Sequence, residues 1–161
     1  MTITEDHVNA AQQAWCDRLV EIGKIHQASG NVSAAAVALV DRLYDYAEGV
    51  VFFKPTMAHG KQTFRPTAKG ALSYFVGGDP DFPDDKGFAL KPWARVWYEN
   101  NAAENGIQIH GNVAMTMGNV YLADHQGNET MVDKTFVFRL CSDRQLRLCV
   151  HKSALPYSPT N

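Results

Sequence analysis

The sequence has almost no excess of charge of either sign. Its 161 residues include 15 lysines and arginines and 17 aspartates and glutamates, which gives a formal net charge of -2. No segment gathers lysine and arginine into the basic cluster that proteins need to bind nucleic acids. We therefore expect no nucleic-acid partner.

Long apolar runs are also missing. No stretch approaches the roughly 20 apolar residues that a membrane-spanning helix needs. The opening segment, MTITEDHVNAAQQAW, is acidic and lacks the basic and apolar regions of a secretory leader. These features predict a cytoplasmic protein with no membrane partner.

Cysteine is scarce, and histidine is not arranged for metal binding. The cysteines are Cys16, Cys141 and Cys149, and no C-x-x-C spacing indicates a disulfide framework or a zinc knuckle. The histidines contain no H-x-H or H-x-x-x-H pair that would form a local site. We predict no metal and no cofactor. Distant histidines such as His59, His110 and His151 could still meet in space, so that alternative stays open.

What the sequence does contain is enough apolar material for one core. With 45% hydrophobic residues in 161 positions, the chain is long enough to bury one core and too short for two ordinary domains. We predict a single domain over residues 1–161.

Apolar periodicity predicts helices in the first third of the chain. Thr4 is placed as an N-cap, and apolar residues then recur every three or four positions up to Ile22. The segment ASGN interrupts this pattern, and Ser33 is expected to cap a second helix that ends at Gly49. A short third helix is predicted in AKGALSYFVGG.

The rest of the chain has the composition of strands. VVFFKPT is β-branched and aromatic and is closed by Pro55. After a loop over residues 77–87, four strand-like segments follow: FALKPWARVWYEN, GIQIHGNVAMTMGNVYLAD, ETMVDKTFVFRLCS and LRLCVHKSALPY. Turn signals at residues 104–106 and 111–112 interrupt them. This order predicts an α+β fold, a cone in which N-terminal helices pack on a curved antiparallel sheet.

Several motifs resemble one family closely. They are FKPTMAHGKQTFRPTAKGALSYFVGGDPDFPDDKGFALKPW, GNVAMTMGNVYLADHQGNETMVDKTFVF and VHKSALPYS. Over residues 50–158 the chain resembles the iota-class carbonic anhydrases, which are related to the calcium/calmodulin-dependent kinase association domain. The resemblance implies the cystatin-like fold of the nuclear transport factor 2 superfamily and the metal-independent hydration of carbon dioxide to bicarbonate.

The resemblance also implies site residues. The family's pocket threonine in F-K-P-T corresponds to Thr56, and the tyrosine in A-L-S-Y-F to Tyr74. The family's H-H-S-S-x-P strand is HKSALP here, which keeps His151 and Ser153 but changes the second histidine and the second serine. The implied catalytic residues are Thr56, Tyr74 and Ser153, with His151 binding substrate.

Strand alternation leaves the position of Ser153 open. In LRLCVHKSA, Lys152 and Ala154 share a face with the apolar Leu148, whereas His151 and Ser153 share the other. If the apolar face lines the cone, Ala154 points inward and a family hydroxyl is lost. If a bulge exchanges the faces, Ser153 points inward.

Two hypotheses from different classes follow. The first is a metal-independent carbonic anhydrase whose hydroxyl groups hold water and bicarbonate. The second is a non-catalytic module of the same fold that binds another small ligand or serves in association. In either case the large residues of WARVWYEN and FVFRL leave more apolar sheet than the helices cover, which predicts a homodimer.

Overall fold

The structure, a computed structural model, describes residues 2–101 and 106–159. Helix α1 spans Glu5–Gln27 and begins at Thr4, whose side chain accepts a hydrogen bond from the His7 N–H, as predicted. Its buried stripe includes Trp15, Leu19 and Ile22. None of the helices in the described ranges is long and apolar enough to cross a membrane.

The second helix begins earlier and ends earlier than predicted. Helix α2 spans Val32–Leu43, and Asn31 caps it by accepting from the Ala34 N–H. The prediction that Ser33 is the cap is wrong, because the asparagine amide two residues earlier already fills that role. The helix stops before Gly49 because the Asp45 N–H donates to the Leu148 carbonyl on a strand.

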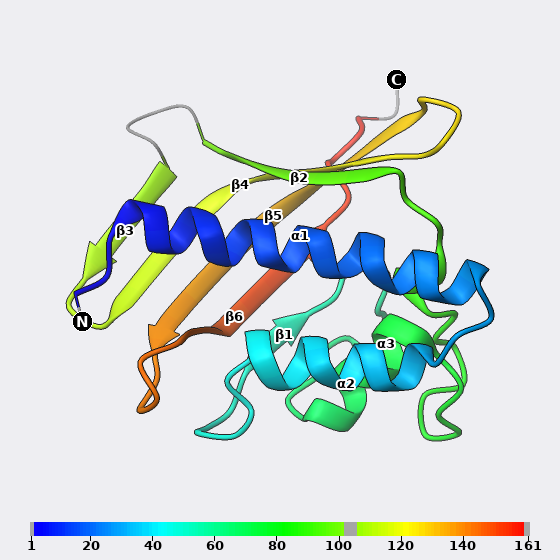
Figure 1. Ribbon diagram of the computed structural model, residues 1–161, viewed down its shortest axis with the longest axis horizontal. Helices are drawn as coiled ribbons and strands as arrows, with labels where there is room; N and C mark the ends of the chain where they lie inside the picture. The colour runs from blue at the N-terminus through cyan, green and yellow to red at the C-terminus, as the bar shows by residue number, and fades with distance from the viewer. Residues whose placement is uncertain (1, 102–105, 160–161) are drawn as a thin grey trace.

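The helices lie on one face of a mixed sheet (Figure 1). The strands are β1 Phe52–Lys54, β2 Arg95–Asn100, β3 Ile107–His110, β4 Val113–Ala123, β5 Glu129–Leu140 and β6 Leu146–Ala154. Their order is β1-β6-β5-β4-β2, and β3 also pairs with β4. The α+β class and the helix-covered sheet are confirmed, and all pairs are antiparallel except β1 with β6.

Two predicted strand boundaries need correction. Residues 88–94 were predicted as strand but form the 3-10 turn Phe88–Leu90 followed by an irregular segment, since Pro92 cannot donate to a ladder. The turn predicted at residues 111–112 joins β3 to β4. The turn predicted at residues 104–106 falls largely on residues 102–105, outside the described ranges.

A β-bulge decides which residues of β6 face the helices. Val137 pairs with Val150 and Phe138 pairs with Leu148, so Cys149 has no register partner on β5. The extra residue shifts the alternation, and Leu148, His151 and Ser153 are all buried on the inner face. Ser153 therefore points inward.

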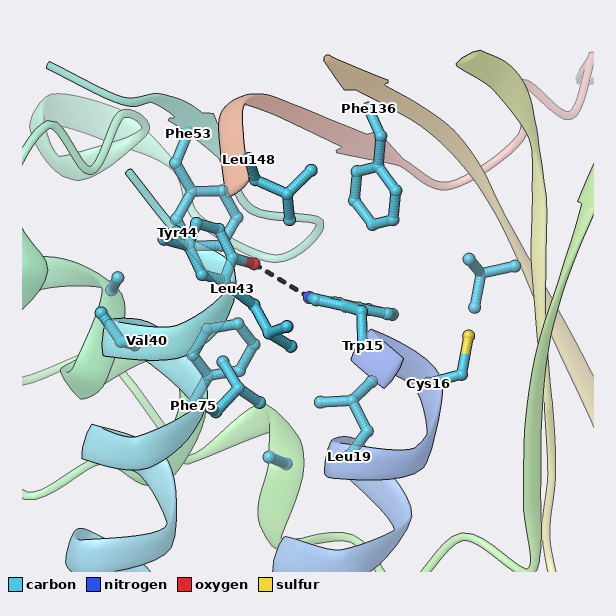
Figure 2. Close-up of a cluster of buried hydrophobic side chains, with 14 of the residues drawn as sticks. Trp15, Cys16, Leu19, Val40, Leu43, Tyr44, Phe53, Phe75, Phe136 and Leu148 are labelled. Atoms are coloured by element: carbon cyan, nitrogen blue, oxygen red, sulfur yellow. Dashed lines mark hydrogen bonds between the residues drawn. The ribbon is translucent and has the colours of Figure 1, made fainter. Parts of the chain in front are cut away.

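The core between α1, α2 and the sheet is largely aromatic. Figure 2 shows Trp15 of α1 lying between Phe136 of β5 and the Tyr44–Phe53 side of the cluster. The indole Nε1 of Trp15 donates to the Tyr44 hydroxyl at 3.0 Å. This bond places a polar contact deep inside a largely aromatic cluster.

Candidate active site

The hydroxyl groups of Thr56 and Ser153 meet at the end of the paired strands β1 and β6. Lys54 is the last residue of β1 and pairs with Lys152, and Pro55 then ends the strand. Thr56 follows, and its Oγ1 lies 2.6 Å from Oγ of Ser153. Residues far apart in sequence thus form a direct hydroxyl pair.

A lysine at the rim holds this pair in position. The Lys54 ammonium donates to the carbonyl oxygen of Thr56 at 3.3 Å and to that of Ser153 at 3.1 Å. Because both hydroxyl-bearing residues are bonded through their backbones to one side chain, their separation is fixed from outside the pair.

Tyr74 approaches the same corner from helix α3, which spans Ala68–Val76 and is capped by Thr67. The centroid of its ring lies 5.9 Å from that of Phe53, with the two rings perpendicular. It lies 5.4 Å from the centroid of Phe88, with the two rings stacked. The Tyr74 hydroxyl is buried and makes no hydrogen bond within residues 2–101 and 106–159.

The charge state of Tyr74 follows from its burial. Burial raises the pKa of Tyr74 to about 12, and the nearby backbone of Met57 and the Thr56 hydroxyl oppose this only in part. Tyr74 is therefore a neutral phenol at physiological pH. It can donate a hydrogen bond to a ligand, but it is not a base.

Helix α3 is held by a buried ion pair that sequence reasoning missed. Arg65 donates to both carboxylate oxygens of Asp85, at 2.6 and 2.8 Å, and Ser73 donates to the same carboxylate at 2.6 Å. Burial alone would raise the pKa of Asp85, but the hydrogen bonds from Arg65 and Ser73 hold it below its usual value. The ion pair joins the segments before and after α3, and the Ser73 hydrogen bond ties the same carboxylate to the residue next to Tyr74.

His151 lies behind the hydroxyl pair, stacked on Phe53 at 4.4 Å. Its Nδ1 lies 2.7 Å from the Tyr44 hydroxyl, and its Nε2 lies 3.1 Å from Nζ of Lys134. Burial and the neighbouring Lys134 lower the pKa of His151 well below its usual value. Both ring nitrogens are thus engaged with protein groups, and substrate binding by His151 stays a prediction.

Lys134 was also missed, although strand alternation contains the signal. In the β5 segment DKTFVF, Lys134 shares a face with Phe136 and Phe138, and all three are buried. A lysine on the apolar face of a strand is rare enough to be a site candidate on its own.

The two changed positions of HKSALP lie away from the hydroxyl pair. Lys152 is exposed, and Ala154 alternates with Ser153 on the outer face. Neither side chain points toward the hydroxyl pair. Of the two hydroxyl positions in this strand, the one facing inward is retained.

Potential metal ligands gather elsewhere. Among the described residues, the group of three that could hold an ion is Asp45, Glu48 and Cys141, and Asp45 is already ion-paired with Arg139. No described group joins His59, His110 and His151.

Comparisons with known proteins place this geometry in context. The family model described as metal-independent carbonic anhydrase matches residues 6–155. A metal-independent carbonic anhydrase from Nostoc sp. (strain PCC 7120) is 50% identical over 157 residues, covering 96% of this chain and 75% of the relative.

Solved structures agree with this assignment. The crystal structure of an iota-carbonic anhydrase from a cyanobacterium, complexed with bicarbonate, superposes with a TM-score of 0.93 at 48% identity, covering 98% of this chain and 95% of that one. A calcium/calmodulin-dependent kinase II association domain from Xanthomonas campestris has a TM-score of 0.57 at 18% identity, covering 92% and 85%. A dehydratase-like NTF2-family protein from Streptomyces avermitilis has a TM-score of 0.58 at 12% identity, covering 95% and 96%. The last two show the fold alone.

Proposed function

Because this chain belongs to the metal-independent carbonic anhydrase family, we propose that it catalyses the reversible hydration of carbon dioxide to bicarbonate. The observation that carries the proposal is the Thr56–Ser153 hydroxyl pair beside the buried, unbonded hydroxyl of Tyr74. Three neutral hydroxyl groups converge where a small polar molecule would find both donors and acceptors.

Each hydroxyl has a role in this proposal. Thr56 and Ser153 each have one proton and two lone pairs, so the pair can accept from a water molecule and donate to it at once. Tyr74 donates to an oxygen of carbon dioxide, on which negative charge grows as the carbon–oxygen bond forms. The raised pKa of Tyr74 supports this role, since the phenol keeps its proton at neutral pH.

The alternative is a non-catalytic module of the same fold. This alternative requires that the two substitutions in HKSALP have removed a group that catalysis needs. The exposed Lys152 and the outward Ala154 favour the enzyme instead, since neither change reaches the hydroxyl pair.

Stopped-flow hydration of carbon dioxide tests the proposal. The protein should accelerate hydration above the buffer rate with a metal chelator present throughout, and Ser153→Ala should remove most of that acceleration. Ala154→Ser is the matched control on the outer face and should leave the rate unchanged. Wild-type protein with no activity above buffer would instead favour a ligand-binding module.

We propose that the protein is a homodimer that joins through the outer face of the sheet. Met117 is 61% exposed there, and Met115 and Val137 line a hollow of about 420 Å³ with it. Light scattering should give twice the mass of one 17.8 kDa chain. A single-chain mass at tens of micromolar would contradict the proposal.

We propose a cytoplasmic location as well. The three cysteines are free thiols, as expected in a reducing compartment. Cell fractionation with an antibody against the protein tests this location, and recovery with an extracytoplasmic fraction would contradict it.

A further inference from the structure

A lysine side chain lies inside the molecule, next to the hydroxyl pair. Lys134 is 2% exposed, and its register partner on the neighbouring strand is Ser153. Directly opposed residues of an antiparallel pair place their side chains on the same face, with Cβ atoms about 5 Å apart. Lys134 and Ser153 therefore extend from the same inner face of the sheet, and the amine of Lys134 lies beside His151, two residues before Ser153.

This lysine has one polar side-chain partner and no acid. Its Nζ lies 3.1 Å from Nε2 of His151 and 4.6 Å above the ring of Trp15. The ion pairs formed within the described ranges do not include Lys134. A positive charge here would be compensated only by aromatic faces and a neutral imidazole.

The titratable groups around Lys134 are neutral. From α1, Cys16 faces it, and burial raises the pKa of this thiol to about 12. From β2, Tyr98 donates to the Lys134 carbonyl at 3.0 Å, and burial raises the pKa of Tyr98 to about 12. From β6 there is His151, whose pKa is lowered by burial and by Lys134.

The hydrogen bonds around His151 fit an uncharged amine. Trp15 donates to the Tyr44 oxygen, which leaves the Tyr44 proton to be donated to Nδ1 of His151. His151 then has its proton on Nε2 and donates it to the lone pair of a neutral Lys134. A charged Lys134 would donate to Nε2 instead, which would leave the Tyr44 hydroxyl proton without an acceptor among residues 2–101 and 106–159.

The proposed reaction needs such a base, and the hydroxyl corner lacks one. Tyr74 keeps its proton, and the threonine and serine hydroxyls lose theirs even less readily, so none of the three is an anion that could accept one. Both ring nitrogens of His151 are already hydrogen-bonded to Tyr44 and Lys134. Lys54 already donates its protons to the carbonyl oxygens of Thr56 and Ser153. Among the described residues, Lys134 is the basic group placed opposite Ser153 on the inner face and has no acid beside it. Burial lowers the pKa of Lys134 to about 7, against a smaller opposing effect of Cys16.

We propose that the Lys134 amine accepts the proton of the water that attacks carbon dioxide, and that the resulting ammonium neutralises the bicarbonate formed. This inference rests on the proposed function. The His151 N–H releases the Nζ lone pair, the water O–H bond breaks, and the water proton joins that lone pair. The water oxygen bonds to the carbon, and one C=O π pair moves onto its oxygen, giving bicarbonate beside a charged lysine. The ammonium returns its proton to solvent or buffer when bicarbonate leaves.

The first test measures protons taken up when an anion binds. Nitrate is a suitable probe because its charge does not change between pH 6 and pH 9. Titration calorimetry at pH 8, in two buffers of different ionisation enthalpy, should show close to one proton taken up per nitrate bound. Below pH 6 the uptake should vanish, because the free protein is already protonated. Above pH 7 the affinity should fall about tenfold per pH unit.

Two lysine variants make the test specific. Lys134→Met should bind nitrate without proton uptake, and its hydration rate should fall on the order of 100- to 10,000-fold with loss of the rise through pH 7. Lys152→Met is the matched control. It removes a lysine that is exposed on the outer face of the neighbouring strand, so proton uptake should remain near one.

The outcomes separate this inference from the proposed function. If wild-type protein binds neither nitrate nor bicarbonate, the bicarbonate site itself is wrong. If it binds them with no proton uptake, the role of Lys134 is wrong and the proposed function stands. If Lys134→Met does not fold, wild-type protein labelled with ¹³C at lysine Cε decides the matter by NMR. One resonance should titrate near pH 7 and become charged with nitrate, and lysines that all titrate above pH 9 would overturn the inference.

Discussion

Two basic side chains are buried to the same extent in this protein but in opposite surroundings. Arg65 and Lys134 are each 2% exposed. Arg65 meets the Asp85 carboxylate with two hydrogen bonds, donates to the Gln62 carbonyl and stacks on a ring. Lys134 meets one imidazole and two aromatic faces. A fully compensated charge holds structure together, whereas an uncompensated amine is free to change its charge.

The largest expected effect comes from breaking the compensated pair. Arg65→Met leaves the Asp85 carboxylate buried without its cation, and we expect a loss of about 3–5 kcal/mol in the free energy of unfolding. Urea denaturation measures it. Lys69→Met is the control, since this lysine forms only exposed ion pairs and its loss should leave stability nearly unchanged. A loss below about 1 kcal/mol for Arg65→Met would remove the contrast.

The same substitution at Lys134 should act in the opposite direction. At neutral pH, Lys134→Met should raise the free energy of unfolding by about 1–4 kcal/mol, because it removes a buried amine that lacks an acid. Destabilisation of the size expected for Arg65→Met would show that Lys134 is compensated after all.

The direction in which wild-type stability changes with pH also tests whether Lys134 is uncompensated. In the folded protein the Lys134 pKa is about 7, below the ordinary 10.5, so the unfolded chain binds more protons between these values. Wild-type stability should therefore fall as pH decreases from about 10.5 to about 7 and then level off. Urea denaturation across this range should show that slope in wild-type protein and lose it in Lys134→Met. An unchanged slope in Lys134→Met would show that another group causes the pH dependence.

Tyr74 extends the comparison to a neutral polar group without a partner. Tyr74→Phe should lower hydration on the order of 10- to 1000-fold and leave the melting temperature nearly unchanged. Tyr46→Phe is the control, because the Tyr46 hydroxyl donates to the Arg65 carbonyl at 2.8 Å. That change should cost about 1 kcal/mol of stability with activity retained. The reverse pattern would make Tyr74 a structural residue.

The smallest effect is expected at the outer face. Ala154→Ser restores a family hydroxyl, but on the side of β6 opposite the site. It should change stability by less than about 0.5 kcal/mol and activity by less than twofold. A clear gain of activity would mean that β6 presents its other face to the substrate.

The sequence predicted the parts of the fold that local patterns determine. The cap at Thr4, the helical stripe of α1 and the hairpin at residues 111–112 each depend on nearby residues, and each is confirmed. Alternation misjudged residues 88–94, where proline and a turn prevail over apolar composition. Thr56, Tyr74 and Ser153 were suggested by resemblance, since nothing local brings residues about 100 positions apart into contact.

Other features depend on distant partners and were not predictable in this way. Arg65 lies before α3 and Asp85 after it, so the two meet only because the fold brings these two segments together. The bulge at Cys149 is defined by the register against β5, and no residue type in LRLCVHKSA requires it. Lys134 is different, because alternation in DKTFVF already places it on the apolar face.

The bulge at Cys149 also bears on how this strand can diverge among relatives. Substitutions change one side chain at a time, but deletion of a single residue between Leu148 and His151 would turn the whole following segment over. Ser153 would leave the interior, and Lys152 and Ala154 would enter it. A change in strand length would therefore disturb the site more than a change of an outer residue. This is why HKSALP can replace two letters of its motif and still present the same inward serine.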